Sequence, residues 1–600
     1  MKHSFFEQII KAFRSKIVVT KLAAINPDNF RKNLIESPIQ IDSFESVAES
    51  PSRQNRYRVN FIDSDIPDQV MAGQTYGAWV ALENKGNFPW LSTDATQPVN
   101  VFVQFDRQVL LTLPFPRGQV LPGERVEIYF SITIPNVVGD HELIVDLVQQ
   151  NVTRFSDQGA DPLRISVWVT QGNPSETSML VSLSRQVNPW FYQPTGGIWQ
   201  GRSGNTFPVF VSKAQGCHIW DSQNQTYIDY VMGWGCYLLG YADQRIQDAI
   251  RSVLDTGAVT PFPYGLEMEV SQMLIDDFPC AEMVVFGKNG SDVCTVAARL
   301  SRAYTGKRII LCSGYHGWQD FWVERMGFEF TGIPDRPEAL IHAFKFNDLE
   351  DFNCLYERYR DDLAAVMLEP AGPAQSIQGH FQDASTEFLQ TIAEKTRQAG
   401  ALLIFDEIVT GYRYPGGSVQ RATGVVPDLA CLGKAIASGM PLSALVGRAE
   451  IFRKSMGQTH YGPTFKGEMY SFAAAKAAIE IYRSEPIADF IWDYGKKLQT
   501  RINALCYERS VGAQCLGPPF RMGLVFDEPS PELLRLKRTL YYQELLKAGI
   551  VTYNGIMLPS YAHNEATFHT TVHGIEMALD QVCHATSKQD FHRRIEIPLL

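Results

Sequence analysis

A single lysine, Lys434, lies in the segment PDLACLGKAIASGMPLSALVGR (residues 427–448), in a run of small and apolar residues. Its neighbours Gly433 and Ala435 offer no carboxylate, and lysine is seldom fully buried without a partner. Apolar surroundings disfavour the ammonium form, so the neutral nucleophilic amine becomes accessible. Schiff-base chemistry needs such an amine. Lys434 is therefore a candidate nucleophile toward an aldehyde.

A second candidate is the turn in VVFGKNGSDVC (residues 284–294), which reads as a strand, a turn of small residues and then a helix. Gly290 lets the backbone approach a ligand, and Ser291 opens the helix with a hydroxyl and free N–H groups. This arrangement is typical of an anion site and suits a phosphate. An ordinary helix start has the same pattern, so the segment alone leaves both interpretations open.

Aromatic and acidic residues follow two other apolar runs. RIILCSGYHGW (residues 308–318) ends at Tyr315 and His316, followed by a glycine, so the aromatic ring could lie flat on a planar ligand. ALLIFDEIVTGYR (residues 401–413) places Asp406 and Glu407 directly after five apolar residues, where a carboxylate could hold a cationic ring nitrogen. A packed tyrosine, a hydrogen-bonded histidine and a salt-bridged or capping acid are the structural alternatives.

Together these features match one cofactor. A phosphate turn, a flat aromatic ring, a carboxylate for a pyridinium nitrogen and a desolvated lysine are the four fixtures of pyridoxal 5′-phosphate. Each is weak alone, but their order along the chain favours one cofactor over four coincidences. The sequence therefore predicts an enzyme that uses pyridoxal 5′-phosphate and no metal.

The elements that must position these residues begin near residue 205. Short apolar runs (EMVVF, RIILC, AAVMLEP, ALLIFDE) alternate with helical patterns, as expected for buried parallel strands in an α/β domain. Ligands of such sheets bind beyond the carboxyl ends of the strands. The candidate residues do follow the apolar runs.

A different pattern precedes this domain. Residues 53–171 read as short strands, and RVEIYFSITIP alternates apolar and polar positions from Val126 to Ile134. We expect an all-β, immunoglobulin-like sandwich here, then a linker at 172–204. Residues 1–50 are predicted to be a helical extension whose apolar face packs on the protein itself or contacts a membrane surface.

Composition narrows the function classes. The chain has 600 residues, 45% of them hydrophobic, and a formal net charge of −11. This balance argues against nucleic acid as the main partner, and no apolar run is long enough for a membrane span. The ten cysteines form no CxxC pair, which suits reduced thiols in the cytoplasm.

Residues 205–585 resemble a fold-type I, class III aminotransferase, nearest to the glutamate-1-semialdehyde aminomutase-like group. The resemblance rests on NGSDVCTVAARLSRAYTGKRIILCSGYHGW, LEPAG, LLIFDEIVTGYR, PDLACLGKAIASGMPLSALVGR and PTFKGEMYSFAAA, among other motifs. It implies a large domain at 205–480 with a mostly parallel sheet and a small C-terminal α+β domain at 481–600. It also implies a homodimer with shared active sites.

The resemblance assigns roles to the matching positions. Lys434 would link covalently to the cofactor and later carry a proton, and Asp406 would keep the ring nitrogen protonated. Gly290 and Ser291 would hold the cofactor phosphate. Tyr315, which His316 follows, would pack on one face of the ring and Ile408 on the other. Thr464 would reach the phosphate of the neighbouring subunit. On the substrate side, Trp234 would line the entrance, with Glu369 and Glu407 as supporting anchors.

Some segments depart from the family pattern. The phosphate turn reads Asn-Gly-Ser where the family usually has Ser-Gly-Thr, and GWG (233–235) replaces the usual SWG. The segment from residue 548 to 579 lacks the arginine with which many members bind a substrate carboxylate. The tail and TFKGE are instead similar to aminomutase-like proteins of polysaccharide biosynthesis.

The leading prediction is transfer of an amino group from a donor such as glutamate to a carbonyl acceptor, for example a keto-sugar or a secondary-metabolite precursor. One alternative is an intramolecular aminomutase, which needs no external donor. Another is a non-catalytic scaffold that binds partners or glycans through the sandwich. ALENKGNFPW, LPGERVEI and LIVDLVQQNVTRF in that sandwich resemble accessory domains of bacterial carbohydrate-related enzymes.

Overall fold

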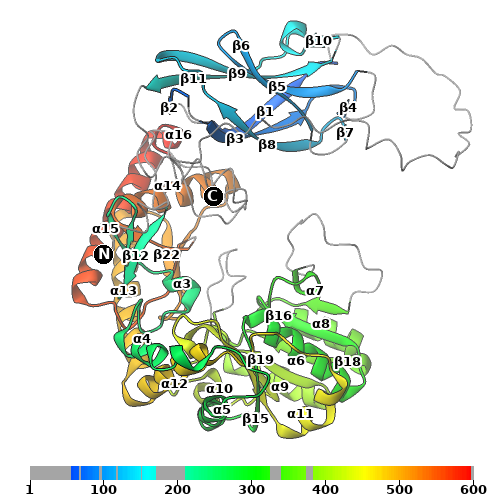
Figure 1. Cartoon of the computed structure of the whole chain (residues 1–600), viewed down its shortest axis with the longest axis vertical. Coiled ribbons are helices and arrows are strands. Elements are labelled where there is room, and N and C mark those ends of the chain that lie inside the picture. Colours follow the sequence, from blue (N-terminus) through cyan, green and yellow to red (C-terminus); the bar gives the residue numbers. More distant parts are fainter. Residues whose placement is uncertain are drawn as a thin grey trace, which may run out of the picture. The chain divides into compact units, whose positions relative to one another are not determined.

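The structure is a computed structural model, shown in Figure 1. It describes residues 56–66, 69–73, 75–92, 97–115, 119–150, 152–170, 210–323, 340–372, 383–553 and 555–595. The predicted helical extension at 1–50 and the predicted linker at 172–204 lie outside these residues.

The strands expected between residues 53 and 171 are present and form two main sheets. One has the order β1-β3-β8 and the other β2-β11-β9-β5-β6. Their bounds are β1 Val59–Asp65, β2 Gln69–Met71, β3 Thr75–Asn84, β5 Val99–Phe105, β6 Gln108–Pro114, β8 Arg125–Thr133, β9 Gly139–Gln149 and β11 Leu163–Thr170.

The alternation in β8 explains how these sheets make a core. Its residues are exposed and buried in strict turn, so Val126, Ile128 and Phe130 point inward. They share one hydrophobic cluster with Leu143 and Val145 of β9 in the other sheet. The two sheets therefore share one hydrophobic core, which is consistent with the expected sandwich.

The central sheet of the α/β part has seven strands in the order β15-β21-β20-β19-β18-β16-β17. Pairs from β17 through β20 are parallel, whereas β21 runs antiparallel to both of its neighbours. The sheet is thus mostly parallel. The bounds are β15 Met283–Gly287, β16 Ile309–Ser313, β17 Ile341–Ala343, β18 Leu363–Leu368, β19 Leu402–Asp406, β20 Leu429–Leu432 and β21 Ser443–Gly447.

Helices cover both faces of this sheet, and every residue of β18, β19, β20 and β21 is buried. Met367 of β18 packs with α6 and α11, while its neighbours Val366 and Leu368 pack with α8 and α9. This period of two explains the continuous apolar runs in the sequence. The helices are α6 Gly290–Thr305, α8 Leu349–Tyr359, α9 Thr386–Gln398 and α11 Ala449–Ser455.

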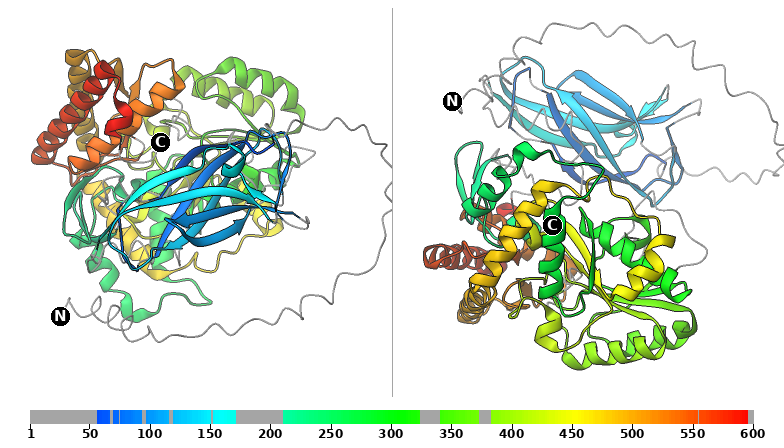
Figure 2. Two further views of the ribbon diagram at one scale, coloured as in Figure 1. Left: turned by 90° about the horizontal axis from the view of Figure 1, so that it is seen from above. Right: turned by 60° about the horizontal axis from the view of Figure 1, so that its bottom comes forward.

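The C-terminal helices form a separate core with two small sheets. α13 (Ile487–Arg509), α14 (Pro531–Lys547) and α15 (Glu565–Lys588) pack around β22 (Ala513–Leu516) and β23 (Met522–Phe526). Figure 2 shows these orange and red helices as one group.

An early segment of the α/β part joins this C-terminal group. β14 (Thr226–Asp229) pairs in parallel with β24 (Ile550–Val551), and Tyr230 lies in the same core as α13–α15. β14 therefore pairs with the C-terminal part of the chain, although it lies within residues 205–480, which the sequence analysis assigned to the large domain.

Two further properties concern the whole described chain. Among the described residues, none of the helices is both long and apolar enough to cross a membrane. All ten cysteines are free thiols.

Candidate active site

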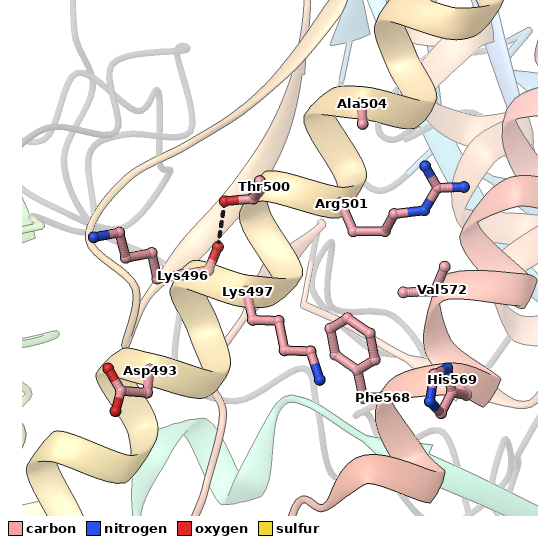
Figure 3. A pocket seen from close by; sticks show the side chains of 9 residues that line it. All are labelled: Asp493, Lys496, Lys497, Thr500, Arg501, Ala504, Phe568, His569 and Val572. Carbon is pink, nitrogen blue, oxygen red and sulfur yellow. Dashed lines mark hydrogen bonds between the residues drawn. The ribbon is translucent and has the colours of Figure 1, made fainter.

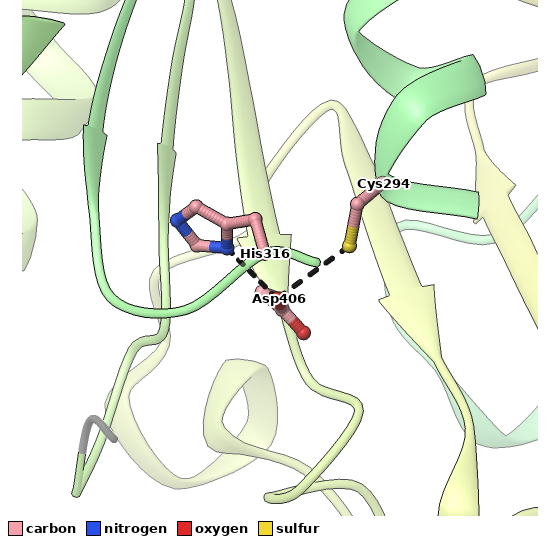
Figure 4. Close-up of side chains that lie close together, drawn as sticks. All are labelled: Cys294, His316 and Asp406. Carbon is pink, nitrogen blue, oxygen red and sulfur yellow. Dashed lines mark hydrogen bonds and ion pairs between the residues drawn. The ribbon is translucent and has the colours of Figure 1, made fainter. Parts of the chain in front are cut away.

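The acid at the end of β19, Asp406, is held by three neighbours and is 3% exposed. Its Oδ2 lies 2.8 Å from His316 Nδ1 and accepts from the Cys294 thiol at 3.6 Å (Figure 4). Its Oδ1 accepts from the backbone N–H of Ile408 at 3.1 Å. Because a carboxylate only accepts, His316 Nδ1 is the donor. The sequence placed Asp406 and His316 in one site, and the structure joins them directly.

Cys294, His316 and Asp406 offer three possible metal ligands whose donor atoms lie within 4.8 Å of one another. A thiol binds metal as the thiolate. Burial raises the pKa of Cys294 well above its usual range, so the group stays a neutral thiol that donates to Asp406. We therefore interpret the cluster as a hydrogen-bonded support for the carboxylate.

The predicted phosphate turn lies against the loop that follows β16. α6 begins at Gly290, and the Asp292 carboxylate accepts from the N–H of Asn289 at 2.8 Å, which caps the helix. Gly317 has φ +137°, and a Cβ placed there would come within 2.4 Å of Ser291 Cβ. Only glycine permits this approach, which brings the loop of Tyr315 and His316 onto the first turn of α6.

Ile408 connects the phosphate turn with the lysine segment. A Cβ at Gly290 would lie 2.5 Å from Ile408 Cδ1, and a Cβ at Gly433 would lie 3.3 Å from its Cγ2. The Ile408 side chain therefore sits between Gly290 and the residue before Lys434. Residues from three strand ends meet at this point, as expected for parallel strands whose carboxyl ends share one edge.

Lys434 follows β20 and adopts the left-handed conformation, with φ 47°. Its side chain is half-buried, and Nζ donates to the carbonyl oxygen of Trp234 at 2.8 Å. Burial lowers the pKa of Lys434 from its ordinary value, as the sequence predicted. The positive charges of Arg521 and Arg413 lower it further, while Cys236 and Glu369 act in the opposite direction.

Glu369, after β18, links the loop of Tyr315 to the C-terminal part of the chain. Its Oε1 accepts from the Tyr315 N–H at 3.2 Å, and its Oε2 lies 3.4 Å from Arg521 Nη1. Arg521 also donates to the carbonyl of Gly372. Both members of the ion pair are buried, with 4% and 7% of their surfaces exposed. Burial raises the pKa of Glu369, and Arg521 opposes this increase.

The remaining predicted residues are Glu407, Trp234 and Thr464. Glu407 is fully buried and accepts from Val419 N, Gln420 Nε2 and Thr410 Oγ1, so it can anchor its loop but cannot touch a substrate. Burial raises the pKa of Glu407 to about 7. Trp234 is 54% exposed, which suits an entrance. Thr464 lies in an exposed turn, and no contact among the described residues joins it to Lys434.

Sequence reasoning missed two buried arginines near Lys434. Arg413 ends the motif LLIFDEIVTGYR, seven residues after Asp406, and is 1% exposed. Arg521 comes from the loop before β23, far from Lys434 in the sequence. The position of Arg413 beside the acid was a usable signal, whereas the local sequence of Arg521 contains none.

The residues present fit pyridoxal 5′-phosphate. The fit rests on a glycine-lined helix start, a buried carboxylate fixed from three sides, and an amine with a lowered pKa, all joined through Ile408. In such a site Gly290 and Ser291 would hold the phosphate and Asp406 the ring nitrogen.

An open groove lies elsewhere, between α13 and α15 (Figure 3). It has a volume of about 640 Å³ and is lined by Lys496, Lys497, Arg501 and Phe568, among others. Lys497 pairs with Glu565 at 2.7 Å and lies over the Phe568 ring. None of its lining residues is a predicted site residue, so the groove does not mark the chemistry.

Comparison with known proteins gives the family. The profile of the family "Aminotransferase class-III" matches residues 199–517, more than half of the chain. The chain is 31% identical over 383 residues to 3-aminobutyryl-CoA aminotransferase of Cloacimonas acidaminovorans, covering 63% of this chain and 90% of that protein. It is 33% identical to glutamate-1-semialdehyde 2,1-aminomutase of Syntrophobacter fumaroxidans, covering 47% and 67%.

Solved structures agree with this family. FumI of Sphingopyxis sp. MTA144, in its PLP internal aldimine form, superposes with a TM-score of 0.59 at 26% identity, covering 63% of this chain and 90% of that one. An omega-transaminase from Sphaerobacter thermophilus gives a TM-score of 0.60 at 25% identity, covering 68% and 98%. The chain therefore belongs to the class III aminotransferases.

Proposed function

We propose that this aminotransferase takes an amino group from an amino-acid donor such as glutamate and passes it to a carbonyl acceptor, for example a keto-sugar or a secondary-metabolite precursor. Its cofactor is pyridoxal 5′-phosphate, which supplies an electron-withdrawing ring for the bond changes at the substrate. The observation that carries the proposal is the Lys434 amine, which is half-buried, has a lowered pKa and is oriented by the Trp234 carbonyl.

The residues of the chain divide the work between them. Asp406, fixed by His316 and Cys294, holds a proton on the ring nitrogen. The lowered pKa of Lys434 means that its amine loses a proton more readily than the amine of an exposed lysine does. Lys434 would therefore accept the proton of the substrate carbon and later return it. Arg521 brings a buried positive charge near this amine, so it is our candidate for the carboxylate of the donor.

A homodimer is supported by an exposed apolar patch beside Thr464. The segments around residues 254–268 and 464–470 touch, because Met469 N–H donates to the Ala258 carbonyl at 2.9 Å. Large exposed patches of this kind mark interaction sites. The exposed side chains are Leu254, Val259, Phe262, Met268 and Phe465. We propose that a second copy covers this patch and that Thr464 reaches the phosphate bound by the partner.

The test is a single half-reaction. Purified enzyme with bound cofactor is mixed with glutamate and other amino donors, without acceptor. Loss of the visible absorption band, with release of one keto acid per site, is expected. Lys434→Ala must lack this response, and Arg448→Gln, which changes an exposed guanidinium paired with Asp428, must keep it. If the wild-type chain takes up no cofactor, the proposal fails.

The same experiment examines the aminomutase alternative, which the similarity to glutamate-1-semialdehyde aminomutases favours. A mutase would convert an amino aldehyde completely without releasing a keto acid. A scaffold would show neither reaction. The role of the sandwich, including glycan or partner binding, stays a prediction, as do the domain boundaries at 53–171, 205–480 and 481–600. A cytoplasmic location fits the ten free thiols.

A further inference from the structure

The Trp234 carbonyl, which accepts a hydrogen bond from Lys434 Nζ, belongs to an unusual turn. Met232, Gly233, Trp234 and Gly235 all have positive φ values, namely 48°, 59°, 54° and 84°. Two of these residues carry side chains that rarely adopt this conformation. Such backbone persists only where its surroundings hold it, and it is concentrated at functional sites. The neighbouring groups that fix this turn are therefore informative.

Asp229 holds the start of the turn, and Arg413 holds its end. The Asp229 carboxylate accepts from the N–H groups of Val231 at 2.7 Å and Met232 at 3.2 Å. Arg413 Nη2 donates to the carbonyl of Gly235, and Nη1 donates to the carbonyl of Val409 at 2.9 Å. The guanidinium thus fastens the turn to the segment that follows Asp406.

The contact between Arg413 and Gly235 is close, and it leaves no space for a side chain at residue 235. A Cβ at Gly235 would lie 3.3 Å from Arg413 Nη2, so a side chain there would push against the guanidinium. The indole N–H of Trp492 donates to the backbone carbonyl of Arg413 at 2.7 Å, which fixes the arginine backbone as well. Hydrogen bonds therefore fix both the guanidinium and the backbone of Arg413.

The charge of Arg413 is as informative as its position. It is 1% exposed, and among the described residues none of its hydrogen bonds or ion pairs is with a carboxylate. Buried charges are normally paired, because an unpaired one is costly. Burial lowers the pKa of Arg413 to about 10, which still leaves it charged at neutral pH. A role outside packing would explain why the chain keeps this cation.

We propose that Arg413 is the positioning residue of Lys434: it holds the Met232–Gly235 turn so that the Trp234 carbonyl aims the Lys434 amine, and it places an unpaired positive charge near that amine. This inference rests on the proposed covalent role of Lys434. An N–H of the amine donates to the carbonyl, so the nitrogen lone pair stays available. The other charged or titratable groups that act on Lys434 are Cys236, Arg521 and Glu369.

Two variants separate position from charge. Arg413→Met removes both the donors and the charge. Arg413→Lys keeps the charge, but a single ammonium cannot reproduce the fork that reaches two carbonyls. Arg448→Gln is the matched control, because its guanidinium is 44% exposed and pairs with Asp428 at the surface.

The first measurement uses the full chain freed of its cofactor, so that it does not depend on activity. Lysines are acetylated with acetic anhydride at a series of pH values, and the peptide containing Lys434 is quantified by mass spectrometry. In the wild type we expect the labelling midpoint of Lys434 below that of exposed lysines. Arg413→Met should raise this midpoint, while Arg413→Lys and Arg448→Gln should leave it in place.

The second measurement is the rate at which added pyridoxal 5′-phosphate becomes attached to Lys434. Arg413→Lys should slow attachment by roughly 10- to 100-fold, since small displacements of a reacting group have such effects. Wild-type midpoints and rates in both Arg413 variants would overturn the inference. If Arg413→Met does not fold, the rate of cofactor attachment in Arg413→Lys still tests the inference. If the wild type attaches no cofactor at Lys434, the proposed function fails first, and the labelling midpoints still report on Arg413.

Discussion

Replacing Arg521 by methionine should destabilise the protein in a strongly pH-dependent way. Arg521 Nη1 lies 3.4 Å from Glu369 Oε2, and both side chains are buried. Methionine has a similar length but no charge, so the variant takes the guanidinium away from a buried carboxylate. Breaking a buried pair in this way typically costs about 3–5 kcal/mol.

Protonation of Glu369 limits that cost. The ordinary pKa of glutamate is 4.5, so at pH 7 a proton can be placed on the carboxylate for about 3.4 kcal/mol. The penalty of Arg521→Met should therefore be about 3 kcal/mol at pH 7 and below about 1 kcal/mol near pH 5, a slope of about 1.4 kcal/mol per pH unit. The sign follows from the raised pKa: the folded state favours the protonated acid, so stability is highest at low pH and is lost as the pH rises.

Urea unfolding of four proteins over this pH range measures the effect: wild type, Arg521→Met, Glu369→Gln and the double variant. Glu369→Gln keeps an acceptor for the Tyr315 N–H but has no charge, so it should lack the pH slope. The double variant should be more stable at pH 7 than the sum of the two single changes implies, by about 0.5–3 kcal/mol. A pH-independent penalty for Arg521→Met, or strict additivity, would refute the reasoning.

Three other predictions follow from the site. Gly317→Ala should weaken cofactor binding at least about tenfold and lower the melting temperature, because its φ is +137° and its Cβ would meet Ser291; cofactor titration and thermal unfolding measure both. In the cofactor-free chain the lowered pKa of Lys434 should make stability rise as the pH increases toward 10.5, relative to Lys434→Met; equal pH profiles would contradict this. Phe262→Asp should convert the proposed dimer to monomers, measured by sedimentation, with loss of activity if Thr464 serves the partner site.

The sequence was informative where chemistry and secondary structure coincide. Asp406 ends β19 and Lys434 follows β20 after one glycine, and parallel strands bring such residues to one edge of the sheet. The buried faces of β8 and the helical face of α6 followed from simple periods of two and of 3.6. The α/β fold and the aminotransferase family were confirmed for this reason.

The sequence was less informative about contacts between distant segments. The pairing of β14 with β24 joins residues more than 300 positions apart, and nothing local to either strand specifies it. Arg521 likewise reaches Glu369 across 152 positions of the chain. Glu407 was expected as a supporting anchor on the substrate side, and its full burial with three hydrogen bonds is consistent with an anchor.

The segment from Asp406 to Arg413 gathers several of the proposed site residues in one loop. Asp406 accepts from the Ile408 N–H within this segment, and Glu407 accepts from Thr410. Arg413 returns to the Val409 carbonyl. The acid proposed for the ring nitrogen (Asp406), the proposed ring contact (Ile408), the anchor Glu407 and the Arg413 guanidinium therefore share one hydrogen-bonded loop. Inserting a single residue there would displace all four together, whereas an insertion in an exposed loop would displace none. The geometry of this loop, more than any one side chain, therefore sets the positions of these groups.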